Sequence, residues 1–89
     1  AFQDSLTGYE RALQIEPDSP QLLNDCAVIL HYHLASADNL ERARGMYQKA
    51  IELAQSQLDA GGLDADHKNR VQTALRDARN NLAAFERKR

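Results

Sequence analysis

The residue types best suited to catalysis are a single cysteine and two nearby histidines, Cys26, His31 and His33. A cysteine nucleophile needs a base within hydrogen-bond reach and surroundings that lower the pKa of its thiol. On a helix, residues five apart point in different directions, and Cys26 begins the most apolar run of the chain, residues 26–30. Because apolar burial raises a thiol pKa, the sequence predicts a core cysteine rather than a nucleophile.

Potential metal ligands occur in the segment His31-Tyr32-His33 and in the acidic loop of residues 59–66. Two histidines that are two residues apart lie on different sides of a helix, and no His-x3-His or Cys-x2-Cys pair occurs. The loop lacks the residue order of a calcium-binding loop. Asp64 or Asp66 is instead suited to cap the helix that follows. We therefore expect structural roles here, with no metal and no cofactor.

Other catalytic signatures are also missing from the sequence. No serine lies in a Gly-x-Ser-x-Gly elbow, and no glycine-rich phosphate loop occurs. The only glycine pair, Gly61-Gly62, precedes Leu-Asp-Ala-Asp, whose carboxylates would repel a phosphate. We expect a protein that is not an enzyme.

The composition predicts an all-α fold for these 89 residues. Four glycines and two prolines are too few for an all-β sandwich or barrel, whereas the abundant Ala, Leu, Gln, Glu and Arg favour helix. One cysteine cannot form an internal disulfide, and no apolar run approaches the roughly 18 residues of a membrane span. These features predict a cytoplasmic protein without a membrane partner. The chain lacks an initiator Met, so we expect a fragment of a longer protein.

Apolar residues recur at helical spacing in four segments, about 4–15, 20–34, 39–58 and 64–88. Ser19 is a good N-cap for the second helix, because Pro20 then occupies the first helical position. Asp38, followed three residues later by Glu41, resembles a capping box for the third. Gly61-Gly62 suits a helix end in a left-handed conformation. The second segment is the most apolar and is expected to form the centre of the core.

The chain repeats itself at an offset of 38 residues. The segment 8–15 aligns with 46–53, so that Tyr9 matches Tyr47 and Ala12 matches Ala50. Periods of about 20–50 residues are typical of arrays of helical hairpins. The matching segments are the first and third helices, and the repeating unit is therefore a helix pair.

These residues resemble the tetratricopeptide repeat family, whose unit is two antiparallel helices of about 34 residues in total. The second helix of that unit reads small-x3-aromatic-x2-Ala-x4-Pro. The chain reproduces it as Ser5-x3-Tyr9-x2-Ala12-x4-Pro17 and, without the proline, as Ala43-x3-Tyr47-x2-Ala50. Ala27 takes the place of the small residue in the first helix of the unit.

The resemblance implies one domain of antiparallel helical hairpins. Residues 1–17 would be the second helix of a truncated repeat, residues 20–57 a full repeat, and residues 64–88 a C-terminal capping helix. The offset exceeds the family period by about four residues, which we place between His31 and Asp38.

The resemblance also implies the function of a non-catalytic scaffold or adaptor that binds a protein or peptide on its concave face. In such arrays the first helices line that face, which here corresponds to residues 20–34. Four residues of this helix are expected to point away from the hairpin core and to contact the peptide: Asn24, Val28, His31 and Tyr32. Asp25 and Val28 stand where a clamp for acidic C-terminal tails would need Asn and basic residues, so binding of such tails is not expected.

An uneven distribution of charge supports an alternative function. Residues 1–66 carry eleven acidic and four basic side chains, a net charge of −7, whereas residues 67–89 carry two acidic and seven basic ones, a net charge of +5. A basic helix can contact nucleic acid, although the acidic remainder would oppose it. The candidate basic residues are Lys68, Arg76, Arg79, Arg87, Lys88 and Arg89.

The first helix has no preceding hairpin partner in this sequence. Its apolar residues Phe2, Leu6, Tyr9 and Leu13 would then form an uncovered edge. Repeat arrays need capped ends for solubility. We therefore expect the isolated chain to form a homodimer in which the first helices of two copies meet.

Overall fold

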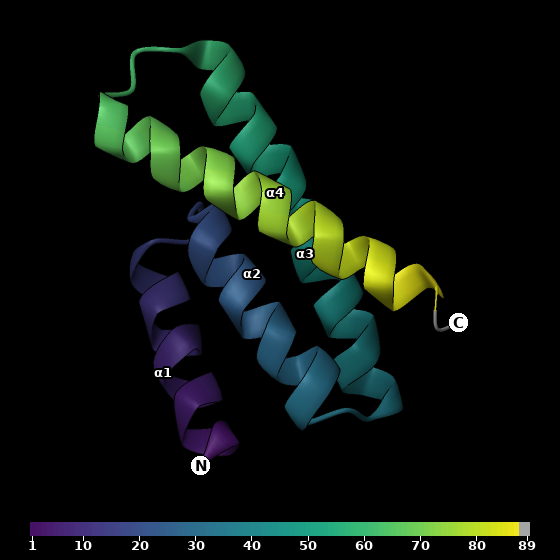
Figure 1. Cartoon of the computed structure of the whole chain (residues 1–89). Coiled ribbons are helices and arrows are strands. Elements are labelled where there is room, and N and C mark those ends of the chain that lie inside the picture. The colour runs from purple at the N-terminus through teal and green to yellow at the C-terminus, as the bar shows by residue number, and fades with distance from the viewer. Residues whose placement is uncertain (88–89) are drawn as a thin grey trace.

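Helices follow one another along the chain in a computed structural model, which describes residues 1–87 (Figure 1). No strand occurs in that range, and the all-α fold is confirmed. The elements are α1 (Phe2–Ile15), α2 (Pro20–Val28), the π-helical segment η1 (Ile29–His33), α3 (Ala37–Ala60) and α4 (Ala65–Arg87).

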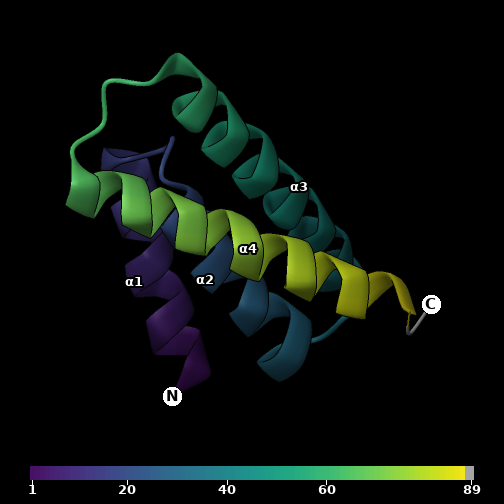
Figure 2. The same ribbon diagram turned by 45° about the horizontal axis from the view of Figure 1, so that its top comes forward.

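Successive α-helices run antiparallel, and α2 lies in the middle of the arrangement (Figure 1). It contacts α1 on one side and both α3 and α4 on the other. The last helix, α4, crosses over α2 and α3, while α1 stays at the opposite edge of the molecule (Figure 2). Polar contacts tie distant segments together: Arg42 of α3 forms an ion pair of 2.8 Å with Glu10 of α1, and the Gln57 amide donates to the Asp18 carbonyl.

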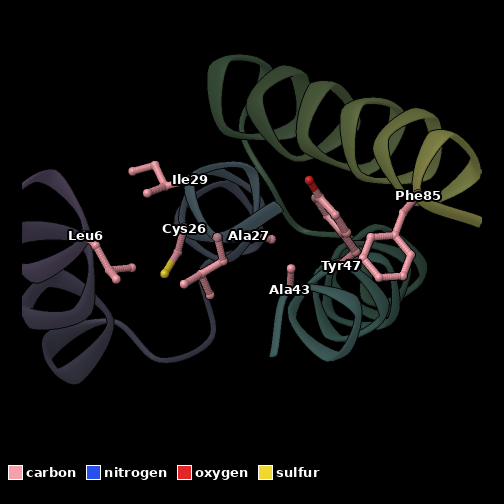
Figure 3. Close-up of a cluster of buried hydrophobic side chains, with 8 residues drawn as sticks. Leu6, Cys26, Ala27, Ile29, Ala43, Tyr47 and Phe85 are labelled. Carbon is pink, nitrogen blue, oxygen red and sulfur yellow. The ribbon is translucent and has the colours of Figure 1, made fainter. Parts of the chain in front are cut away.

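The core is built from a few large side chains and many alanines. Tyr47, Leu30 and Cys26 are the largest side chains that are completely buried. Alanines at the helix crossings allow the backbones to approach closely, and those that are completely buried are Ala27, Ala43, Ala50, Ala54 and Ala78. Figure 3 shows Leu6 pointing from α1 toward Cys26, with Tyr47 and Phe85 on the far side of the cluster.

Two of the expected helix starts are confirmed. The Ser19 hydroxyl accepts from the Leu22 N–H ahead of α2, and Asp64 caps α4 by accepting from the His67 N–H at 2.7 Å. Both Gly61 and Gly62 have positive φ, as expected. A side chain at either position would be strained.

The expected start of the third helix is wrong. Ser36, rather than Asp38, is the N-cap of α3, because its hydroxyl accepts from the Asn39 N–H at 3.1 Å. Asp38 instead lies in the first turn, where its charge complements the helix dipole. The helix also extends to Ala60, two residues beyond the expected end.

The second helix does not stay α-helical to Leu34. It passes at Ile29 into η1, where the Leu34 N–H donates to the Ile29 carbonyl five residues earlier. The Asn39 side-chain amide donates to the Leu34 carbonyl at 2.7 Å and joins the end of η1 to α3. A π turn holds more residues than an α turn, and it lies close to the place where the repeat is lengthened.

The first helix covers more of its apolar stripe than expected. Leu6 is buried, and Tyr9 and Leu13 are partly buried against the same core. The expectation that Leu6 forms an open edge is therefore wrong, since α2 and η1 already cover it. Among its large apolar side chains, Phe2 and Ile15 stay exposed, the latter by 82%.

Candidate protein-binding surface

The structure divides the four expected peptide-binding residues into two pairs. Asn24 is buried, and its side-chain oxygen accepts from the Asn81 amide of α4 at 3.0 Å. His31 is half-buried, with Nδ1 3.1 Å from the Tyr47 hydroxyl and its ring edge-on to Phe85. Both side chains contact α4, which crosses this face of α2: Asn24 through Asn81 and His31 through Phe85. Val28 is half-buried, and Tyr32 is exposed.

The outward face of α2 and η1 is displaced from the expected one. Its members on α2, at steps of four and three residues, are exposed or half-buried: Gln21, Asp25 and Val28. Tyr32 lies in the π-helical segment, where its exposed ring is 4.0 Å from the ring of His31. Asn24 and His31 fit the same helical spacing on the neighbouring face, which the crossing of α4 covers. No signal in the sequence separates the two faces, because the contacts of Asn24 and His31 depend on where α4 crosses α2.

A groove with a volume of about 290 Å³ lies beside this outward face, between α1 and the α2–η1 segment. Its lining is mainly aromatic and aliphatic: Phe2, Ser5, Tyr9, Asp25, Val28, Ile29 and His33. The rings of Phe2 and His33 stack at a centroid distance of 3.8 Å and hold the end of α1 against η1. The sequence does not indicate the α1 side of this groove, because apolar periodicity describes one helix at a time.

Asp25 supplies the negative charge of the groove. Burial raises the pKa of its carboxyl above the ordinary 3.8, and the carboxylate of Asp77 on α4 raises it further. A hydrogen bond with the Asn24 side chain opposes the rise but does not cancel it. Charged Asp25 is thus poorly stabilised by its surroundings, and an added cationic group would favour it.

A second, larger cleft of about 610 Å³ lies at the other end of the molecule, between the α1–α2 loop and the first half of α4. Its polar lining includes Glu16 and Asp18 on one side and His67 and Arg70 on the other. Charges of both signs face this cleft, which therefore has no single preference for a charged ligand.

The residues considered for catalysis or metal binding are not assembled into a site. Burial raises the pKa of the Cys26 thiol to about 11, with a smaller contribution from Glu10, so the thiol is protonated at neutral pH. The expected core cysteine is confirmed, since its side chain is completely buried. His31 faces Tyr47 and His33 stacks on Phe2. Among residues 1–87, no group of three His, Cys, Asp or Glu residues is placed to hold a metal.

Two of the basic residues of α4, Arg76 and Arg79, contact polar groups of the same molecule. Arg79 donates to the Gln55 side chain, and Arg76 forms a 3.6 Å ion pair with Asp77. Glu86 pairs with Arg44 of α3 at 3.2 Å. Two of the candidate basic residues, Lys88 and Arg89, lie outside the described residues.

In comparisons with known proteins, no family model, no curated protein and no solved structure matches this chain. Within residues 1–87, every helix is too short or too polar to serve as a membrane span. The repeated motif and the contacts described above are therefore the grounds for a function.

Proposed function

We propose that this chain is a non-catalytic interaction module of the tetratricopeptide-repeat type, which binds a segment of another protein in the groove between α1 and the α2–η1 segment. Support comes from the repeated Tyr-x2-Ala motif and from the order of antiparallel helices, in which α4 follows the repeat as a cap. Val28 and Tyr32 keep the role expected of them. Asp25 and the α1 residues Phe2 and Tyr9 replace Asn24 and His31.

The open groove is the observation that carries the proposal. Phe2, which lines the groove, is 49% exposed. Tyr32 of η1 lies outside this lining and is 48% exposed. Aromatic side chains that are partly exposed beside a polar group are typical of the centre of a protein interface. Val28 adds aliphatic surface, and Asp25 adds one charge that can fix the orientation of a bound segment.

A selection of displayed random peptides on the immobilised chain tests this function. We expect enriched peptides whose binding is at least about tenfold weaker on a Val28→Glu variant, because the new charge lies in the groove. Gln48→Glu is the matched control, since it adds the same charge at an exposed position of α3. Peptides that bind both variants equally, or no enrichment at all, would reject the proposal.

Two narrower hypotheses have less support. Self-association through α1 loses its central residue, because Leu6 is covered within one chain. Nucleic-acid binding through α4 is opposed by Asp77 and Glu86, which pair with arginines on or beside that helix. A salt titration of binding to duplex and single strands separates nucleic-acid contact from protein binding, because phosphate contacts weaken steeply with salt.

A further inference from the structure

The two copies of the repeat allow α1 to be compared with α3, position by position. On α3, one face is completely buried, and it consists of Ala43, Tyr47, Ala50 and Ala54. The equivalent positions 38 residues earlier, three on α1 and one at its C-cap, are exposed or half-buried: Ser5, Tyr9, Ala12 and Glu16. Similar helices thus present the same face to different surroundings.

The covering of this face by α2 explains the difference. On α3, Ala43, Tyr47 and Ala50 pack in clusters that contain Leu23, Ala27 and Leu30 of α2 and η1. Ala54, at the end of the face, packs against Val71 and Leu75 of α4. On α1, no helix of residues 1–87 takes the corresponding place, because α1 lies at the edge of the molecule (Figures 1 and 2). The open face of α1 is therefore equivalent to the face of α3 that α2 covers.

The most exposed apolar side chain of the molecule belongs to this open surface. Ile15 is 82% exposed, whereas its equivalent Leu53 packs against the cluster of Leu23 and Ala50. Gly8 likewise stands where α3 has Met46, which also contacts that cluster. A Cβ added at Gly8 would meet no atom within 4 Å, which leaves room for a bulky side chain from outside.

We propose that this face of α1 binds an amphipathic helix of a partner protein, in the way that α2 covers α3. The inference rests on the proposed function and names the partner of the same region. The occupant is expected to present a leucine, a small residue four positions later and a leucine three positions after that, as Leu23, Ala27 and Leu30 do. By analogy with the α2–α3 contact, the small residue would lie beside Ser5 and Tyr9, and the first leucine would lie beside Ala12 and cover Ile15.

Charge at the borders of the face selects a basic partner. Three carboxylates belong to α1, its C-cap and the adjoining groove: Asp4 is in the first turn of α1, Glu16 is its C-cap, and Asp25 lines the groove with Ser5 and Tyr9. Arg11 of α1 is exposed and carries the opposite charge. The whole of residues 1–66 has a net charge of −7. Lysines on the flanks of the bound helix would lie near these carboxylates and raise both affinity and association rate.

A synthetic helix with the Leu-x3-Ala-x2-Leu pattern and flanking lysines is the probe. We measure its binding to the full chain by fluorescence anisotropy and its helicity by circular dichroism. We expect saturable binding, with a gain in peptide helicity and a Kd on the order of 10 μM. Ile15→Glu should weaken binding at least about tenfold. The matched control is Gln14→Glu, an exposed position that points about 100° away from Ile15 around α1, and it should change binding less than about twofold.

Three results would overturn the inference. The first is no saturable binding of the lysine helix, or equal binding to the Ile15→Glu and Gln14→Glu chains. The second is equal affinity for a helix with glutamates in place of lysines, which would remove the charge argument. The third is sedimentation that shows a dimer of the chain broken by Ile15→Glu, which would assign the face to a second copy. Selected peptides that need Val28 but not Ile15 would keep the proposed function and reject this inference.

Discussion

At the scale of single residues, burial decides which of the reactive-looking groups can act. Cys26 is completely buried, and its thiol pKa of about 11 keeps it protonated well above neutral pH. Its type suggested chemistry, but its neighbours are apolar. Asp25 has the opposite character, because it is only partly buried and its charge faces the groove.

The thiol of Cys26 should make the fold sensitive to alkali. The unfolded chain loses this proton near 9.0, whereas the folded chain holds it to about 11. The contribution to stability is therefore complete below pH 9.0 and is lost as the pH rises toward about 11. Urea midpoints of the wild-type chain and Cys26→Ala should converge across that window. A constant difference between them would contradict the assigned pKa.

Ionised Asp25 should destabilise the fold at neutral pH. Its pKa is higher in the folded chain than the ordinary 3.8, so stability is lost as the pH rises above that value. Asp25→Asn should raise the urea midpoint at neutral pH, and the gain should shrink in acid. Glu52→Gln, at an exposed position of α3, serves as the control and should show no such trend. A midpoint lowered by Asp25→Asn at neutral pH would show that the carboxylate is stabilising.

Substitution by alanine should lower the free energy of unfolding by different amounts at the two tyrosines of the repeated motif. Tyr47 is completely buried, and its hydroxyl lies 3.1 Å from Nδ1 of His31, whereas Tyr9 is half-buried at the open face. Tyr47→Ala should cost about 3–5 kcal/mol of unfolding free energy. Tyr9→Ala should cost clearly less, and Arg87→Ala less than about 0.5 kcal/mol. Equal denaturant midpoints for the two tyrosine variants would contradict the difference in burial.

At the scale of the helices, sequence patterns located the elements but not every boundary. The break at Pro17 and the cap at Ser19 follow from local chemistry and needed no tertiary information. Local chemistry alone does not determine the start of α3, because Ser36 and Asp38 are both acceptable caps. The π turn of η1 depends on how residues 29–34 pack against α3, and apolar spacing alone does not reveal it.

The cap of α3 offers a direct comparison of the two candidates. Ser36→Ala should cost about 1 kcal/mol, because the Asn39 N–H loses its acceptor. Asp38→Asn should cost less than about 0.5 kcal/mol, and high salt should remove that cost, since it is a charge–dipole effect. Thermal unfolding at low and high salt measures both. If Asp38→Asn lowered the stability more than Ser36→Ala, and by the same amount at low and high salt, Asp38 would be the N-cap of the helix.

At the scale of the whole molecule, the crossing of α4 over α2 separates the expected site from the observed one. The sequence predicted four helices, an all-α fold and an outward role for Val28 and Tyr32. The burial of Asn24 and His31 could not be predicted, because it depends on the angle and register at which α4 crosses α2. The groove could likewise not be predicted from the sequence, because its two walls come from different helices.

Amide chemical shifts of the full chain, recorded during titration with a peptide selected on it, test the central claim most directly. We expect the largest shift changes at Phe2, Tyr9, Val28 and His33, which line the groove, and small ones at the outer arginines of α4. Changes centred on Lys68 and Arg76, or spread evenly over the molecule, would contradict an interaction module that binds between α1 and the α2–η1 segment.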